Sequence, residues 1–225
     1  MSTGQEDYTS GVSIAGYTIT SLPIDIITQT LGTVAIDIKA QTLAQLNVNI
    51  AASAVTINVN LSSQSAFNLN IDIAEQSVGN VAVNIAASAI TLNVNLSSSS
   101  ITLNVNLSSS SITLNINIAA QGVNLSVINA TATHLDIDIA AQSVGNVAVN
   151  IAASAITLNV NLAASAITLN VNISSQSAFN LNVNLAASAI TLNVNISSQS
   201  ANINVNLAAS AITLNVNVTN ATITI

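Results

Sequence analysis

Apolar and polar residues alternate along most of this 225-residue chain. In the phrase "ITLNVNL", Ile90, Leu92, Val94 and Leu96 occupy every second position, and Thr or Asn stands between them. A period of two places successive side chains on opposite faces of a β-strand. The pattern therefore predicts strands with one buried apolar face and one solvent-exposed face of Thr and Asn.

The same phrase is repeated from end to end. We call the last apolar residue of each phrase its anchor; anchors run from Ile14 to Val218 at spacings of 11 or 12 residues. Only the phrase around Val127, which we take as its anchor, fits poorly. Self-similarity at a short fixed period is typical of a solenoid or a fibre array.

One phrase is too short to be a whole coil. A seven-residue strand spans roughly 23 Å at about 3.3 Å per residue, and the four or five residues left cannot return that distance. Long identical segments such as "QSVGNVAVNIAASAITLNVNL" recur after an even number of phrases. These features predict an all-β solenoid with two strands per coil of 22 to 24 residues and nine or ten coils. Antiparallel hairpins and a trimeric fibre of intertwined chains around one shared core are the alternatives.

The position before each anchor is Asn or Asp in almost every phrase. When identical strands stack in register, side-chain amides can hydrogen-bond from one strand to the next as a ladder. We therefore expect an outer-face ladder that includes Asn95, Asn106, Asn117, Asn161 and Asn172.

The 12-residue phrases carry Gln at the third place after the anchor. A pair of one large and one small apolar residue then follows, as in Val78-Gly79, Val144-Gly145 and Ala178-Phe179. This arrangement predicts a bulged corner, in which one side chain fills the end of the core and its neighbour must be small.

The segment before Ile26 departs from the pattern. It holds both tyrosines, the only proline, Pro23, and the acidic pair Glu6-Asp7. We predict an irregular N-terminal cap or attachment segment over residues 1–25 and solenoid repeats over residues 26–225.

Composition removes several classes of function. The net charge is −7 and Lys39 is the only basic side chain, which argues against nucleic acid, because phosphate binding needs clustered Lys and Arg. No apolar run approaches the roughly 18 residues of a membrane span, so we expect no membrane insertion. The start "MSTGQEDYTS" has no apolar core of a secretory signal. Solubility must come from 33 Asn, 30 Ser and 21 Thr, whose hydration does not depend on pH.

The segment "HLDID" is the one local cluster of candidate metal ligands: His134, Asp136 and Asp138 alternate onto one face. However, these positions carry Thr, Asn and Asn in other phrases. Residues two apart on a strand are also about 7 Å apart, too far for easy chelation. We expect a solvated face, no cofactor and no metal.

An enzyme is not expected. With one His, one Lys and no Cys, neither a triad nor an acid–base pair in a pocket can be assembled. Outside the N-terminal pair Glu6-Asp7, the only close carboxylate pairs are Asp72-Glu75 and Asp136-Asp138.

Nine glycosylation sequons occur, about as many as this composition produces by chance. The sequons begin at Asn60, Asn95, Asn106, Asn124, Asn129, Asn172, Asn195, Asn217 and Asn220.

The short tandem phrases resemble the shafts of β-solenoid fibres, adhesins and spikes, and phrases such as "VNIAAQSVGN" resemble repetitive proteins of archaea and their viruses. The resemblance implies a structural protein of an extracellular filament or virion: a stiff, self-associating spacer that contacts virion or cell-surface components. The alternative is a surface-binding module for ice or polysaccharide that uses the flat Thr/Asn face. The resemblance transfers no functional residue.

Overall fold

The computed structural model describes residues 9–27, 32–51, 54–74, 77–129, 134–153, 156–175, 178–198 and 200–219. These residues contain strands and turns but no helix, and every strand belongs to one sheet. The strands are β1 (Thr9–Ile27), β2 (Thr33–Ala51), β3 (Ala54–Ser63), β4 (Ala66–Ala74), β5 (Ser77–Asn129), β6 (His134–Ala153), β7 (Ile156–Ala163), β8 (Ala166–Ser175), β9 (Ala178–Ala186), β10 (Ala189–Ser197), β11 (Ser200–Ala208) and β12 (Ala211–Thr219).

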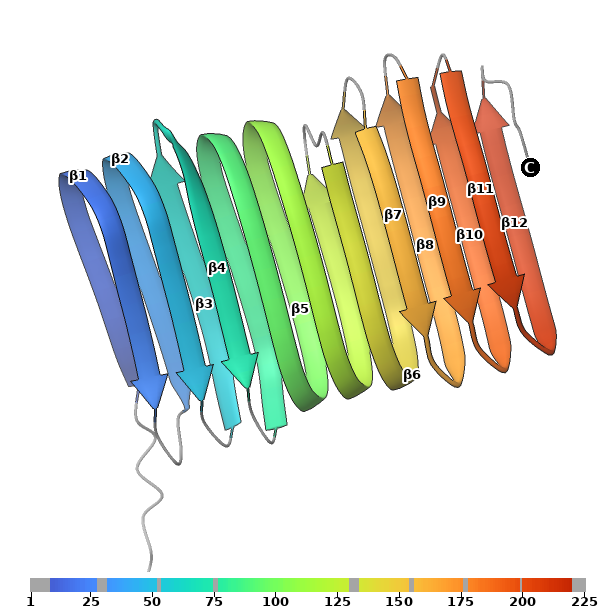
Figure 1. Ribbon diagram of the computed structural model, residues 1–225, viewed down its shortest axis with the longest axis horizontal. Helices are drawn as coiled ribbons and strands as arrows, with labels where there is room; N and C mark the ends of the chain where they lie inside the picture. Colours follow the sequence, from blue (N-terminus) through green and yellow to red (C-terminus); the bar gives the residue numbers. More distant parts are fainter. Residues whose placement is uncertain are drawn as a thin grey trace, which may run out of the picture.

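The chain winds into a β-solenoid of about eight turns, with two strand segments in each coil (Figure 1). All pairings among the described strands are parallel, and partners lie one coil apart in sequence, as with Asp25 and Asn49 or Asn193 and Asn215. The predicted two-strand coil is therefore confirmed. Because the pairing is parallel and one chain encloses its own core, antiparallel hairpins and the intertwined three-chain fibre are not the fold.

The two sides of the coil form two solvent-exposed faces. Face A contains β4, β7, β9 and β11, and face B contains β3, β8, β10 and β12. The longer strands β1, β2, β5 and β6 bend round a corner and contribute to both faces (Figure 1). Alternate phrases of the sequence thus lie on opposite sides of the rod.

The core lies between the two faces and is continuous along the rod. Leu92 and Val94 are completely buried, and the anchor Leu96 is nearly so, whereas Asn95 between them is exposed. The same alternation holds in most coils, so one apolar cluster extends from Ile24 to Ile203. The burial predicted from the period of two is confirmed.

Two of the 12-residue phrases form bulged corners of the predicted kind. The pairing register shifts by one residue at Gly79 and again at Gly145, so that each glycine is the extra residue. A Cβ atom on Gly145 would lie 2.5 Å from Oδ1 of Asn124, so a larger residue would displace this oxygen, which accepts from the N–H of Asn146. Phe179 fills the core at a related corner, beside the exposed Ala178.

Two details of the prediction are wrong. Val127 pairs with Val149, so it is not an anchor, and Asn129 lies beside the true anchor Ile151. The alternation in this phrase is consistent with either register, and the backbone bulge at Val123 and Asn124 decides between them.

The predicted boundary at Ile26 is also not a structural boundary. Strand β1 runs through it and pairs with β2 from Thr9 to Ile27, so residues 9–25 already belong to the solenoid. Pro23 fits because β1 is the first strand in the pairing order, where a missing N–H is tolerated. Residues 1–8 lie outside the described residues, and a capping or attachment role stays a prediction.

Candidate functional site

The most regular surface feature is a set of asparagine ladders that run along the rod. On each face we call the row next to the anchors the edge ladder, and the row two residues earlier the middle ladder. The edge ladder of face A consists of Asp25, Asn49, Asp72, Asn95, Asn117, Asp138, Asn161, Asn184 and Asn206. Its middle ladder consists of Asn47, Asn70, Asn93, Asn115, Asp136, Asn159, Asn182 and Asn204. The edge ladder of face B consists of Asp37, Asn60, Asn84 and Asn106, and then Asn150, Asn172, Asn195 and Asn217.

The ladder bonds all have the same direction. In each, Nδ2 of an asparagine donates to Oδ1 of the residue in the preceding coil, as from Asn117 to Asn95 at 2.9 Å. Bonds that end on an asparagine measure 2.8 to 3.0 Å in these ladders, as from Asn184 to Asn161 and from Asn84 to Asn60. The side-chain amide dipoles are therefore aligned along the rod, with their N–H ends toward the N-terminus.

Aspartates stand only at the N-terminal end of each uninterrupted run of ladder bonds. Asp25, Asp72, Asp136 and Asp138 accept from the next coil at 2.6 Å, and Asp37 accepts at 2.7 Å. Bonds to a carboxylate are shorter because the acceptor is charged. An ionised carboxylate has no hydrogen to donate to the coil before it, so each aspartate begins a run. Asp72, Asp136 and Asp138 also interrupt a ladder, whereas Asp25 and Asp37 are the first members of theirs.

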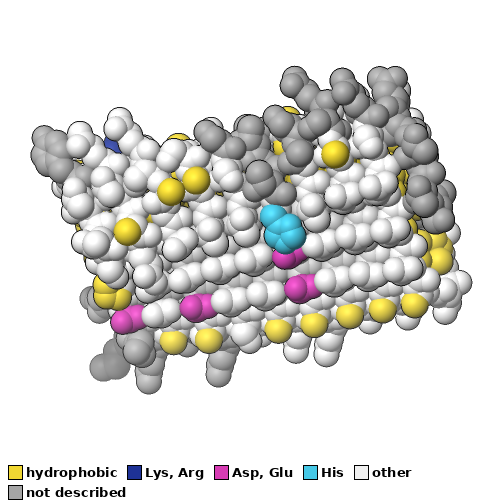
Figure 2. Space-filling model, turned by 45° about the horizontal axis from the view of Figure 1, so that its top comes forward, with side chains coloured by type: hydrophobic (Ala, Val, Ile, Leu, Met, Phe, Trp, Pro, Cys, Tyr) yellow, Lys and Arg dark blue, Asp and Glu magenta, His cyan; other side chains and the backbone are white. Residues whose placement is uncertain are grey.

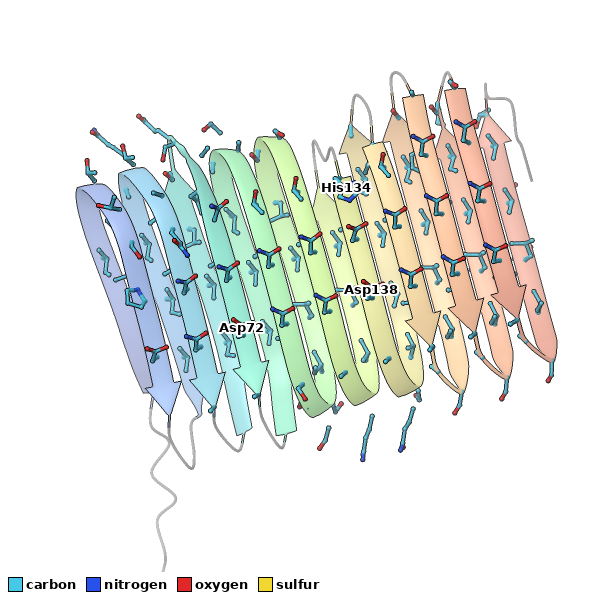
Figure 3. The ribbon with its side chains drawn as sticks, viewed as in Figure 1. Asp72, His134 and Asp138 are labelled. Carbon is cyan, nitrogen blue, oxygen red and sulfur yellow. The ribbon has the colours of Figure 1, made fainter. Side chains whose placement is uncertain are left out.

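The predicted ladder residues all take part, but in two separate ladders. Asn95, Asn117 and Asn161 lie on face A, while Asn106 and Asn172 lie on face B, where they donate to Asn84 and Asn150. Figure 3 shows the amide side chains in rows across the strands, with Asp72 and Asp138 in one row. The sequence predicted the ladder; the direction of its bonds and the role of the aspartates were missed. The signal was the position of each Asp, which replaces Asn at intervals of a few phrases.

The structure brings together two of the three candidate metal ligands. His134 Nε2 lies 2.8 Å from Asp136 Oδ2, closer than the strand spacing suggested, because the long imidazole side chain reaches along the strand. Asp138 instead accepts from Asn161 in the edge ladder. Within the described residues, no group of three His, Asp or Glu side chains could hold a metal ion. Figure 2 shows the histidine against an acidic side chain, on a face where further acidic side chains stand among mostly uncharged ones.

Six sequon asparagines are members of ladders: Asn60, Asn95, Asn106, Asn172, Asn195 and Asn217. Each uses Nδ2, the atom to which a glycan would be attached, to donate to the preceding coil. Asn124 is exposed, and its Oδ1 accepts from the backbone N–H of Asn146 at 3.2 Å. The side chain of Asn129 and the whole of Asn220 lie outside the described residues. Whether any of these asparagines is glycosylated stays a prediction.

A shallow groove of about 1460 Å³ follows the edge of face A along the rod. One wall is the edge ladder, and the other is the row of small residues after the anchors: Ala51, Ala74, Ser97, Ala119, Ala140, Ala163, Ala186 and Ala208. This row is visible along the lower border of Figure 2. The groove is long and almost uniform, so it offers repeated amide and methyl groups and not one enclosed site.

No family model matches this chain, and neither a curated protein nor a solved structure shows significant similarity to it. The described part of the chain contains no helix long and apolar enough to cross a membrane.

Proposed function

We propose that this protein is a structural component of an extracellular filament or virus particle, a stiff spacer whose copies associate end to end and whose outer face or tip contacts a host surface. The observation that carries the proposal is the continuous rod, in which core, backbone pairing and amide ladders repeat with almost no variation. A repeat in which each coil contacts only its neighbours adds length without changing the surface. The nearly uncharged Thr and Asn surface supports a role in varied salt and pH.

The last described strand supports the association of copies. Ile212, Leu214 and Val216 point toward the core side of β12, yet they are exposed, and no described strand pairs with the far edge of β12. At the other end of the rod, Ile14, Ile19 and Leu22 of β1 are only partly buried. An open strand edge above an uncovered core is a surface that another parallel coil can continue. We propose that a second copy of this chain supplies that coil.

Electron microscopy and analytical ultracentrifugation of the purified full chain test this association. We expect rods longer than one chain, and we expect the double variant Ile212→Lys with Leu214→Lys to abolish them, because two charges would be buried at the junction. Thr213→Lys, on the solvent-exposed side of the same strand, is the matched control and should leave association unchanged. A wild-type chain that stays a single rod at high concentration would contradict the end-to-end association.

The placement in a filament or virion is tested separately. Antibodies against the purified chain should label filaments or virus particles from the source cells in immunogold microscopy. Labelling confined to the cell interior, with no filament or particle marked, would contradict this part of the proposal.

A surface-binding module is the second candidate, and the flat grid of amides on face A favours it. Thr113 and Thr157 continue this grid, and the trough between the middle and edge ladders follows the rod. Thermal hysteresis and sedimentation with insoluble polysaccharides measure such binding. If face A binds a surface, Thr113→Lys with Thr157→Lys should remove binding, whereas Thr102→Lys with Thr168→Lys on face B should preserve it.

A further inference from the structure

At one level of the rod the asparagine ladders that join the coils elsewhere have no bond, although the backbone N–H of Asn146 still donates to Asn124 Oδ1 across it. This level lies between the anchors Ile118 and Ile139. On face A, Asn117 donates back to Asn95, so its Oδ1 faces Asp138, and no hydrogen bond joins the two. The middle ladder is interrupted in the same way between Asn115 and Asp136. In both ladders an acceptor faces an acceptor, because an ionised carboxylate cannot donate.

Face B is interrupted at the same level by a different residue. Ile128 stands beside Asn150, at the position that Asn occupies in most coils of the edge ladder. It is 52% exposed, so it neither donates to the ladder nor joins the core. Beside it in the sequence, Ser126 pairs with Ala148, and the bulge at Val123 and Asn124 shifts the register. Among the described residues, no ladder bond therefore crosses this level on either face.

Elsewhere, an interruption in one of three ladders (the edge and middle ladders of face A and the edge ladder of face B) leaves the other two bonded. At the level of Asp72 the edge ladder of face A is interrupted, but Asn70 still donates to Asn47 in the middle ladder at 2.8 Å. On face B, Asn84 donates to Asn60 at 3.0 Å. Among the described residues, the level between Ile118 and Ile139 is thus the one where the edge and middle ladders of face A and the edge ladder of face B all stop together.

The charged residues at this level are bonded within their strand or to the next coil. Residues 67–80 and 133–146 have closely similar sequences, and His134 and Asp136 replace Asn68 and Asn70 of the earlier copy. The two replacements contact each other at 2.8 Å. Asp136 also accepts from Asn159 in the following coil. None of these bonds reaches back across the level.

Backbone and core remain continuous there. Strands β5 and β6 pair from Thr113 to Asn129, and Leu114 and Leu135 are buried on either side. In a repeat protein, stability is approximately the sum of the intrinsic stabilities of the coils and of the interfaces between neighbours. An interface without ladder bonds contributes less free energy, so it couples the unfolding of the coils on its two sides more weakly.

We propose that this level is a joint that divides the solenoid into two cooperative units, residues 9–129 and residues 134–219, which unfold separately. The units share a core, but each is held together internally by its own ladders. The inference concerns the rod itself and does not depend on its proposed role.

Hydrogen exchange followed by mass spectrometry in graded urea tests the joint. In the wild-type chain we expect the segments 77–118 and 156–198 to lose protection at two different urea midpoints. The triple variant Ile128→Asn, Asp136→Asn and Asp138→Asn supplies donors to Asn115 and Asn117 on face A and an acceptor for Asn150 on face B. It should bring the two midpoints together. All three positions lie on the solvent-exposed faces, and Asn occupies the matching positions of other coils, so the variant keeps the residue types that the fold uses.

Asp72→Asn is the matched control, because it repairs an interruption inside the first unit. It should raise the midpoint of segment 77–118 and leave two separate midpoints. A single common midpoint in the wild-type chain would overturn the proposal. So would a triple variant that retains the wild-type spectrum in far-ultraviolet circular dichroism but keeps the full gap between the midpoints.

Discussion

Strands β10 and β12 have almost the same sequence and very different surroundings. They read "AITLNVNIS" and "AITLNVNVT", and they pair with each other in register. Leu192 of β10 is fully buried, whereas Leu214 of β12 is 49% exposed. Their ladder asparagines differ too, because Asn195 both donates and accepts, while Asn217 only donates. The alternating pattern therefore determines which side of the strand each residue faces, and the neighbouring coils determine how far each side chain is buried.

The core position should give the largest difference between the two strands. Leu192→Ala should lower the free energy of unfolding by about 2–5 kcal/mol, because it leaves a cavity in a closed core. Leu214→Ala should cost about 1 kcal/mol or less, as for a partly exposed side chain. Urea denaturation of dilute protein, followed by circular dichroism, measures both. Equal losses would mean that β12 is covered in solution, and a loss at Leu214 that grows with protein concentration would identify the cover as another copy.

The ladder position should give a smaller difference. Asn195→Ala removes the donor to Asn172 and the acceptor for Asn217, whereas Asn217→Ala removes only the donor to Asn195. At about 0.5–1.5 kcal/mol for each net hydrogen bond, the first change should cost about twice as much as the second. The same denaturation experiment measures the ratio. A larger loss from Asn217→Ala would show that the ladder extends beyond β12.

The threonine position should give almost no difference. Thr191 and Thr213 lie side by side on the solvent-exposed face, and Asn replaces Thr in this column at Asn146. Thr191→Asn and Thr213→Asn should each change the free energy of unfolding by no more than about 0.5 kcal/mol. If Thr191→Asn alone lowered the free energy of unfolding nearly as much as Leu192→Ala, this face would be buried against another molecule in solution.

Much of the fold could be predicted because the same alternation of apolar and polar residues recurs in nearly every phrase. The alternation around Leu92 and Val94 gave the buried side, and the even spacing of long identical segments gave two strands per coil. The glycines of Val78-Gly79 and Val144-Gly145 marked the bulges correctly. Prediction failed where the repeat is least regular: Val127 was assigned to the wrong register, and residues 9–25 were separated from a solenoid to which they belong.

The candidate site was less predictable, because it depends on contacts between coils. The sequence placed His134, Asp136 and Asp138 on one face. Only the folded structure shows that His134 contacts Asp136 and that Asp138 belongs to a ladder. It also placed Asn95 and Asn106 in one ladder, whereas they lie on opposite faces. Residues one phrase apart lie on opposite faces of the rod, and residues two phrases apart lie on the same face.

The sequence alone determined the strand, its buried side and the coil of two phrases, because these follow from a period of two and from the reach of a short strand. The tertiary structure decided which asparagines bond, in which direction they donate, and where their ladders stop. Those properties arise only when one coil lies about 4.8 Å from the next, so that an amide meets another amide, a carboxylate or Ile128. The same stacking makes Leu192 part of a core and leaves Leu214 exposed.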